Sequence, residues 1–83
     1  MYHKVAEVKA NDNYTLIVKF DNLVTKQYDA GKLLSDTRFE SLKDKALFKT
    51  VKVDAGGYGI IWNDDIDISE NEIWTEGEEV YNS

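Results

Sequence analysis

Apolar side chains alternate with other residues along residues 14–20, where every second position is aromatic or aliphatic. A period of two is typical of a strand that buries one face. Residues 24–28 continue with β-branched and aromatic residues after Asp21 and Asn22. Asn tolerates the left-handed backbone of a tight turn. We therefore expect the two segments to form a hairpin.

Residues 4–9 are predicted to add a strand next to this hairpin. Val5 and Val8 would lie on opposite faces of a regular strand, which indicates a bulge or a strand covered on both sides.

A second hairpin is predicted further along the chain. Residues 51–53 alternate in the same way, and Gly56-Gly57 allow a turn into residues 59–62. Ile66 and Ile68 alternate with aspartates and indicate a short final strand. The next apolar anchor is at residues 72–74.

Between the hairpins the apolar spacing becomes helical. The residues that share one face of a helix are Phe39, Leu42, Ala46 and Leu47. Thr37 and Glu40 have the spacing of a capping box, so the helix is expected to begin near Arg38.

These elements predict an α+β fold. We expect a small, mostly antiparallel sheet built from two β-hairpins and an N-terminal strand, with one short amphipathic helix packed on it, and with Val18 and Phe39 in the core. A chain of 83 residues can bury one modest core, and it has no cysteine to supplement that core with disulfides. We assign residues 1–76 to a single domain and expect residues 77–83 to form a frayed acidic tail.

Composition and charge restrict where the protein acts. Apolar residues make up 42% of the chain, but none of its apolar runs approaches the length of a membrane span. The first residues lack the features of a secretory signal, so we expect a soluble cytoplasmic protein without membrane contact. The net charge is −6, which disfavours direct binding to nucleic acid. All lysines and arginines lie between Lys4 and Lys52, which leaves the C-terminal third strongly anionic.

No set of residues indicates catalysis. His3 is the only histidine and lies near the chain end, and no serine has the flanking glycines of a nucleophile elbow. We therefore expect a protein that is not an enzyme and that carries no cofactor.

One acidic segment has partial metal-site character. Asp65, Asp67 and Glu76 match the first, third and twelfth positions of a calcium-binding loop. The sixth position, which requires glycine, is Glu70, so these three residues are only weak candidates for metal ligands and we assign no metal site.

The two tryptophans leave alternatives open. Trp62 and Trp74 can be core residues or exposed anchors for a partner, because tryptophan is favoured both inside small domains and at interfaces. The residues with partner-binding character are Trp74, Glu72, Glu76, Glu78 and Glu79.

The order of these features resembles a bacterial family of small domains, domain of unknown function 2442. The residues that carry the resemblance are Val5, Val8, Tyr14, Leu16, Val18, Phe20-Asp21, Tyr28-Asp29, Phe39, Leu42, Asp44, Phe48, Val51, Val53, Ile60, Trp62, Asn63, Asp65 and Ile66. The family usually has glycine in the first hairpin turn, where this chain has Asn22. The resemblance implies a compact α+β domain, alone or joined to other modules, and implies no activity.

Two functional hypotheses follow. The first is a non-enzymatic protein-interaction or regulatory module, whose edge strands accept a partner strand or a second copy of the chain as a homodimer. The second is an acidic antitoxin-like or nucleic-acid-mimicking inhibitor, whose anionic C-terminal third occupies a basic groove on its target.

Overall fold

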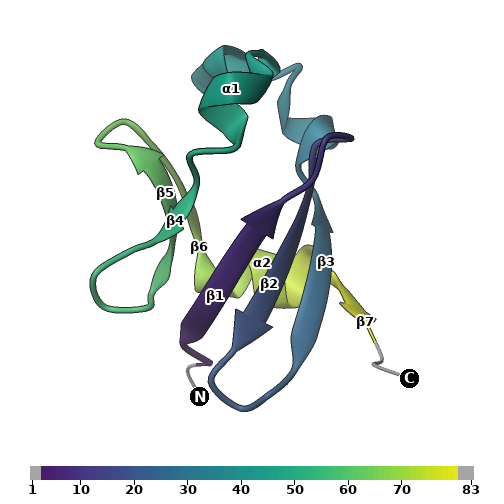
Figure 1. Cartoon of the computed structure of the whole chain (residues 1–83), viewed down its shortest axis with the longest axis vertical. Helices are drawn as coiled ribbons and strands as arrows, with labels where there is room; N and C mark the ends of the chain where they lie inside the picture. The colour runs from purple at the N-terminus through teal and green to yellow at the C-terminus, as the bar shows by residue number, and fades with distance from the viewer. Residues whose placement is uncertain (1–2, 81–83) are drawn as a thin grey trace.

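The computed structural model describes residues 3–80 and has the α+β fold predicted from the sequence, with antiparallel strands and short helices (Figure 1). In chain order the elements are β1 (Val5–Ala10), β2 (Thr15–Phe20), β3 (Thr25–Asp29), the 3₁₀ helices η1 (Ala30–Leu33) and η2 (Thr37–Lys43), α1 (Lys45–Phe48), β4 (Lys52–Val53), β5 (Gly59–Asn63), β6 (Ile66–Ser69), α2 (Glu70–Glu76) and β7 (Glu78–Val80).

The first sheet has four strands in the order β1-β2-β3-β7. The predicted hairpin is its centre, with Leu16 of β2 opposite Tyr28 of β3. The pairing of β1 with β2 shifts register between Val5 and Glu7, which confirms the bulge expected from the spacing of Val5 and Val8.

The turn between β2 and β3 differs from the sequence prediction. Leu23, not Asn22, adopts the left-handed backbone, with a φ of 72°. The side-chain oxygen of Asn22 accepts a hydrogen bond from the N–H of Val24 (3.1 Å). Asn22 therefore caps the turn with its side chain, and the left-handed position falls on the next residue.

The second hairpin and the short final strand are present, but they form a separate sheet of three strands in the order β4-β5-β6. The sheet expected to be continuous is therefore divided, because the helical segment from η1 to α1 leads the chain to the other side of β1 (Figure 1). The two sheets meet where the N–H of Val5 donates to the carbonyl of Gly57 (2.8 Å).

The helix predicted between the hairpins is interrupted. Residues 37–43 form the 3₁₀ helix η2 and α1 follows, so one continuous α-helix was the wrong prediction. Asp36, not Thr37, caps the first segment by accepting from the N–H of Arg38 (2.9 Å). Asp44 has an extended backbone and its side chain accepts from the N–H of Ala46 (2.9 Å). An aspartate side chain that bonds the backbone N–H two residues further on competes with helix continuation.

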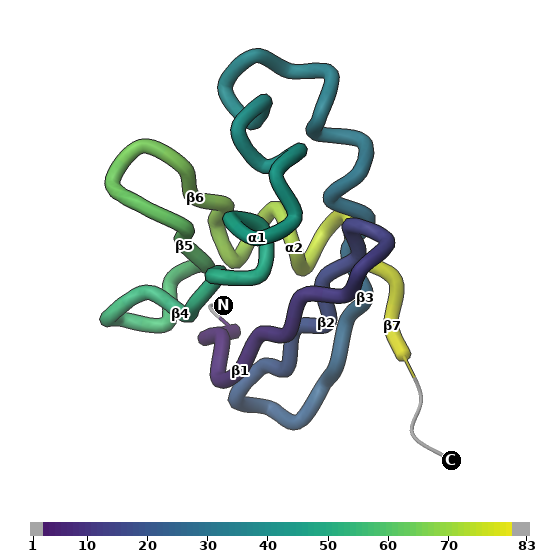
Figure 2. The backbone as a smooth tube through the Cα atoms, turned by 45° about the horizontal axis from the view of Figure 1, so that its top comes forward, coloured from purple at the N-terminus to yellow at the C-terminus, as the bar shows by residue number. Residues whose placement is uncertain are grey.

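Helix α2 was not predicted from the sequence. Ser69 accepts a hydrogen bond from the N–H of Glu72 at the start of α2 (3.2 Å), and Gly77 N–H donates to Ile73 at the end (2.8 Å). The helix lies against one face of the four-stranded sheet and contacts β3, β5 and β6 (Figures 1 and 2). It therefore joins the two sheets.

The segment after α2 is more ordered than the sequence suggests. Residues 78–80, expected to belong to a frayed tail, form β7 and pair with residues 25–27 of β3. The remaining residues of that tail, 81–83, lie outside the described residues. None of the helices in residues 3–80 has the length and apolar character needed to cross a membrane.

Both sheets contribute to one hydrophobic core. Its buried members are Val5, Leu16, Val18, Phe20, Tyr28, Ala30, Leu42, Phe48, Ile60, Trp62, Ile66, Ile68 and Ile73. Phe48 lies between the ring of Tyr14 (centroids 5.1 Å apart) and that of Trp62 (6.0 Å). Val18 is buried as expected, whereas Phe39 is only half-buried and packs on the margin of the core.

Candidate functional site

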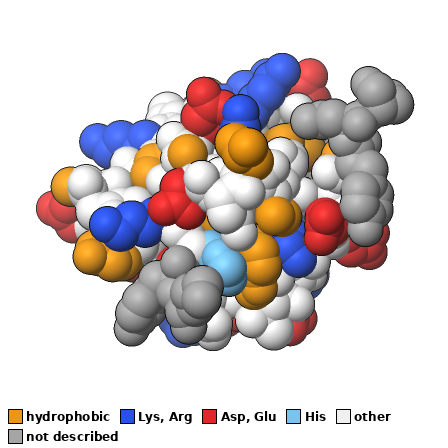
Figure 3. All heavy atoms as spheres, turned by 90° about the horizontal axis from the view of Figure 1, so that it is seen from below, with side chains coloured by type: hydrophobic (Ala, Val, Ile, Leu, Met, Phe, Trp, Pro, Cys, Tyr) orange, Lys and Arg blue, Asp and Glu red, His pale blue; other side chains and the backbone are white. Residues whose placement is uncertain are grey.

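Trp62 and Trp74 have different environments. Trp62 is buried, and its indole N–H donates to the carbonyl of Phe48 (2.8 Å), so it is a core residue. Trp74 is half-buried. Figure 3 shows a face of the molecule on which a histidine side chain lies among hydrophobic side chains.

Trp74 is contacted by neighbours from the same chain. The ring of His3 stacks on it with centroids 3.8 Å apart, the ring of Phe20 meets it edge-on at 5.1 Å, and the ammonium of Lys26 lies 4.7 Å from its centroid. The Nδ2 amide of Asn22 lies 3.0 Å from Nδ1 of His3. The contacts of His3 are thus with a tryptophan ring and an amide, an arrangement that holds the N-terminal segment in place.

The glutamates of α2 are also used within the chain. The hydroxyl of Tyr28 donates to Oε2 of Glu72 (2.9 Å). Burial of the phenol, together with this bond to Glu72, raises the pKa of Tyr28 well above its usual value. Glu76 lies 3.7 Å from the ammonium of Lys32. Two of the four predicted partner-binding glutamates therefore have intramolecular partners.

Glu78 and Glu79 lie on β7, at one edge of the four-stranded sheet, and both are exposed. In the register of β7, Glu78 is opposite Gln27 and Glu79 is opposite Lys26. They are predicted partner-binding residues that the fold leaves exposed.

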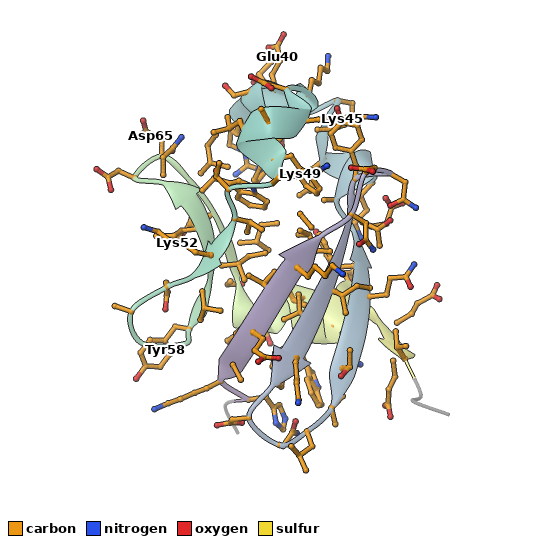
Figure 4. The ribbon with its side chains drawn as sticks, in the orientation of Figure 1. Glu40, Lys45, Lys49, Lys52, Tyr58 and Asp65 are labelled. Carbon is orange, nitrogen blue, oxygen red and sulfur yellow. The ribbon has the colours of Figure 1, made fainter. Side chains whose placement is uncertain are left out.

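The three weak metal candidates are not brought together. Asp65 is in the turn between β5 and β6, Asp67 is on β6, and Glu76 is the last residue of α2 beside Lys32 (Figure 4). Within residues 3–80, no group of three or more His, Cys, Asp or Glu side chains is placed to hold a metal ion.

A groove that the sequence did not predict lies between the two sheets. It has a volume of about 680 Å³ and is lined by residues 7–9 of β1, by Ile17, Lys19 and Thr25 on the outer face of β2 and β3, and by residues 51–53 at β4. We call this feature the edge groove. A second hollow of about 500 Å³ extends it along residues 8–12 toward Lys49.

The two strands beside the edge groove are both sheet edges. β1 ends the order of the first sheet and β4 ends the order of the second, and the two strands contact each other. Asn11 N–H bonds toward β2, at Thr15, so the alternation of an antiparallel ladder directs the N–H and C=O of Val8 and Ala10 away from β2.

The same reasoning applies to β4. Asp54 N–H bonds to the carbonyl of Gly59 in β5, so the backbone groups of Val51 and Val53 point away from β5. Outward-facing backbone groups of two edge strands therefore border one groove. The Val5–Gly57 hydrogen bond links the start of β1 to the turn between β4 and β5.

Side chains along the edge groove are sorted by face. On β1 the half-buried Val8 precedes the exposed Lys9. On the opposite side of the groove, at β4, the exposed Lys52 lies between the half-buried Val51 and Val53. Figure 4 shows Lys52 projecting from β4 and Lys49 leaving the end of α1. Lys49 pairs with Asp12, and this ammonium holds the pKa of the Asp12 carboxyl below its usual value.

Sequence reasoning expected edge strands to accept a partner and placed the candidate partner-binding residues at the acidic end, but it did not predict this groove. The alternation of valine and lysine in both segments was visible, but their proximity depends on the packing of two sheets. The signal that could have suggested the groove is the concentration of all lysines and arginines before residue 53.

Comparison with protein families identifies the chain. Residues 5–79 match the model of the family described as Protein of unknown function (DUF2442), so the chain belongs to this family. No curated protein and no solved structure matched the chain.

Proposed function

We propose that this domain is a non-enzymatic interaction module that binds a segment of another protein as an added strand in the edge groove. The observation that carries the proposal is that two edge strands from different sheets border one groove with their outward backbone groups. An extended segment placed there can hydrogen-bond to a sheet edge, which is a common mode of peptide recognition.

The charges of the edges favour a different protein over a second copy of the chain. Symmetric pairing of two β7 strands would bring Glu78 and Glu79 of both copies together. Symmetric pairing of two β1 strands centred on Lys9 would bring the two Lys9 side chains together. Like charges across a strand pair are destabilising, so these two homodimers are disfavoured.

Photocrosslinking in the native host tests this proposal. A photoreactive residue in place of Lys9 should give a discrete crosslinked protein, whereas the same residue in place of Lys45, on α1, should not. Ala10→Pro removes an N–H that points away from β2, which an edge strand tolerates, and it should abolish the crosslink while the domain stays folded. A crosslink that is equally strong at both positions, or that survives Ala10→Pro, contradicts the proposal.

The exposed glutamates of β7 favour a second candidate, an inhibitor that offers an acidic edge to a basic target. This interaction would weaken strongly with salt, because the contacts are between exposed charges. Glu78→Gln with Glu79→Gln should then reduce binding, and a partner held equally well by this variant rules the candidate out.

A further inference from the structure

We propose that the strand bound in the edge groove alternates acidic and apolar side chains. This inference rests on the proposed function and specifies the chemistry of the partner.

The first argument is charge. The chain has a net charge of −6, yet the edge groove is lined by Lys9, Lys19 and Lys52 against a single acid, Glu7. The groove is therefore a cationic site on an anionic protein, and an acidic segment is attracted to it over the rest of the surface.

The second argument is the availability of these cations. Within residues 3–80, Lys9 and Lys52 make no salt bridge, whereas Lys32 and Lys49 are paired with acids. Lys19 has Glu7 opposite it on β1. The exposed ammonium groups of Lys9 and Lys52, on opposite sides of the groove, can therefore bind a carboxylate without breaking an internal ion pair.

The third argument is the sorting of side chains by face. Successive side chains of a strand point to opposite faces. Both β1 and the segment at β4 therefore have valine on one face and a lysine on the other. Because β1 and β4 contact each other, a bound strand lies along the groove beside their edges and not between them. It would meet Val8, Val51 and Val53 with one face and the lysines with the other. Alternating apolar and acidic residues satisfy both faces.

The groove fits a peptide better than a polynucleotide. Half-buried valines offer apolar surface, and the outward N–H and C=O groups of Val8 and Ala10 can hydrogen-bond to a peptide backbone. A phosphate chain would use the lysines but leave the carbonyl oxygens unpaired.

Binding of synthetic peptides tests the inference. The probes are fluorescent, end-blocked octapeptides of alternating Glu and Val, of alternating Lys and Val, and of the same Glu and Val residues in scrambled order. We expect saturable binding of the alternating Glu-Val peptide only, with NMR shifts at the amides of Val8, Ala10 and Val53. Equal binding of the Lys-Val or the scrambled peptide overturns the inference.

Charge reversal provides the matched control. Lys9→Glu with Lys52→Glu should weaken Glu-Val binding at least tenfold, whereas Lys43→Glu with Lys45→Glu, the same charge change outside the groove, should change it less than twofold. Equal effects of the two variants overturn the inference. So does displacement of the peptide by a single-stranded oligonucleotide, or a dimer in light scattering that Lys9→Glu and Lys52→Glu dissociate.

The two proposals can fail separately. If the host crosslink from position 9 persists in a variant with Lys52→Glu and Lys19→Glu but is lost in Ala10→Pro, strand addition stands and the acidic partner is wrong. If Ala10→Pro has no effect on the crosslink, strand addition itself is wrong.

Discussion

At the residue scale, the turn between β2 and β3 contains a residue whose backbone conformation lowers the stability of the fold, and a substitution can relieve this. Leu23 has a φ of 72° and is 78% exposed, so its side chain contributes little packing while its Cβ disfavours the left-handed backbone. Leu23→Gly should raise stability by about 0.5 kcal/mol, which is roughly 2–4 °C in the melting temperature of a domain this size.

The neighbouring position provides the control for this prediction. Asn22→Gly should lower the melting temperature, because it removes the side-chain oxygen that accepts from Val24. If glycine stabilises at position 22 and destabilises at 23, the left-handed residue has been assigned to the wrong position.

The Tyr28–Glu72 pair predicts a dependence of stability on alkaline pH. The folded state raises the pKa of Tyr28 above its unfolded value of 10.0. The stabilisation by the protonated Tyr28 is therefore complete below pH 10 and is lost as the pH rises above it. Between pH 10 and 11 the wild type should lose up to about 1.4 kcal/mol relative to Tyr28→Phe. Denaturant titrations of both proteins at several pH values measure this, and parallel losses contradict it.

At the scale of elements, α2 depends on its cap. Ser69→Ala removes the oxygen that accepts from Glu72 N–H and should cost about 1 kcal/mol. Ser69→Asp retains an acceptor and should melt close to the wild type. Since α2 contacts both sheets, melting curves should show the alanine loss in the global transition, and a local change without a shift of that transition contradicts this role.

The strands could be predicted from the sequence because each buries one face and so shows a period of two. Both hairpins and the β1 bulge follow from that pattern. Helix α2 shows no such period, since only Ile73 and Glu70 are buried within its 7 residues. The spacing of Ser69 and Glu72 was the available signal for its start.

The break in the helical segment at Asp44 and the division of the strands into two sheets were harder to predict from the sequence. The apolar spacing of residues 39–47 fits an α-helix, and the side-chain bond of Asp44 to the N–H of Ala46 decides against a continuous one. Which strands share a sheet depends on long-range packing, and local patterns do not encode it. The edge groove is a product of that packing and could not be predicted for the same reason.

At the scale of the whole molecule, Phe48 connects the two sheets through Tyr14 and Trp62. Phe48→Ala should cost about 3–5 kcal/mol, most of the stability of a domain this small. Phe39→Ala should cost only about 1–2 kcal/mol, because Phe39 is half-buried. Denaturant unfolding of both variants measures the difference, and equal costs contradict the position of the core.

The central claim is that a strand from another protein binds along the edge groove beside β1 and β4. Hydrogen exchange of the complex captured from the host tests it most directly. The account predicts that the amides of Val8, Ala10 and Val53 exchange far more slowly in the complex than in the free domain, while those of β7 are unchanged. Protection of β7 with no change at Val8, Ala10 and Val53 would contradict it.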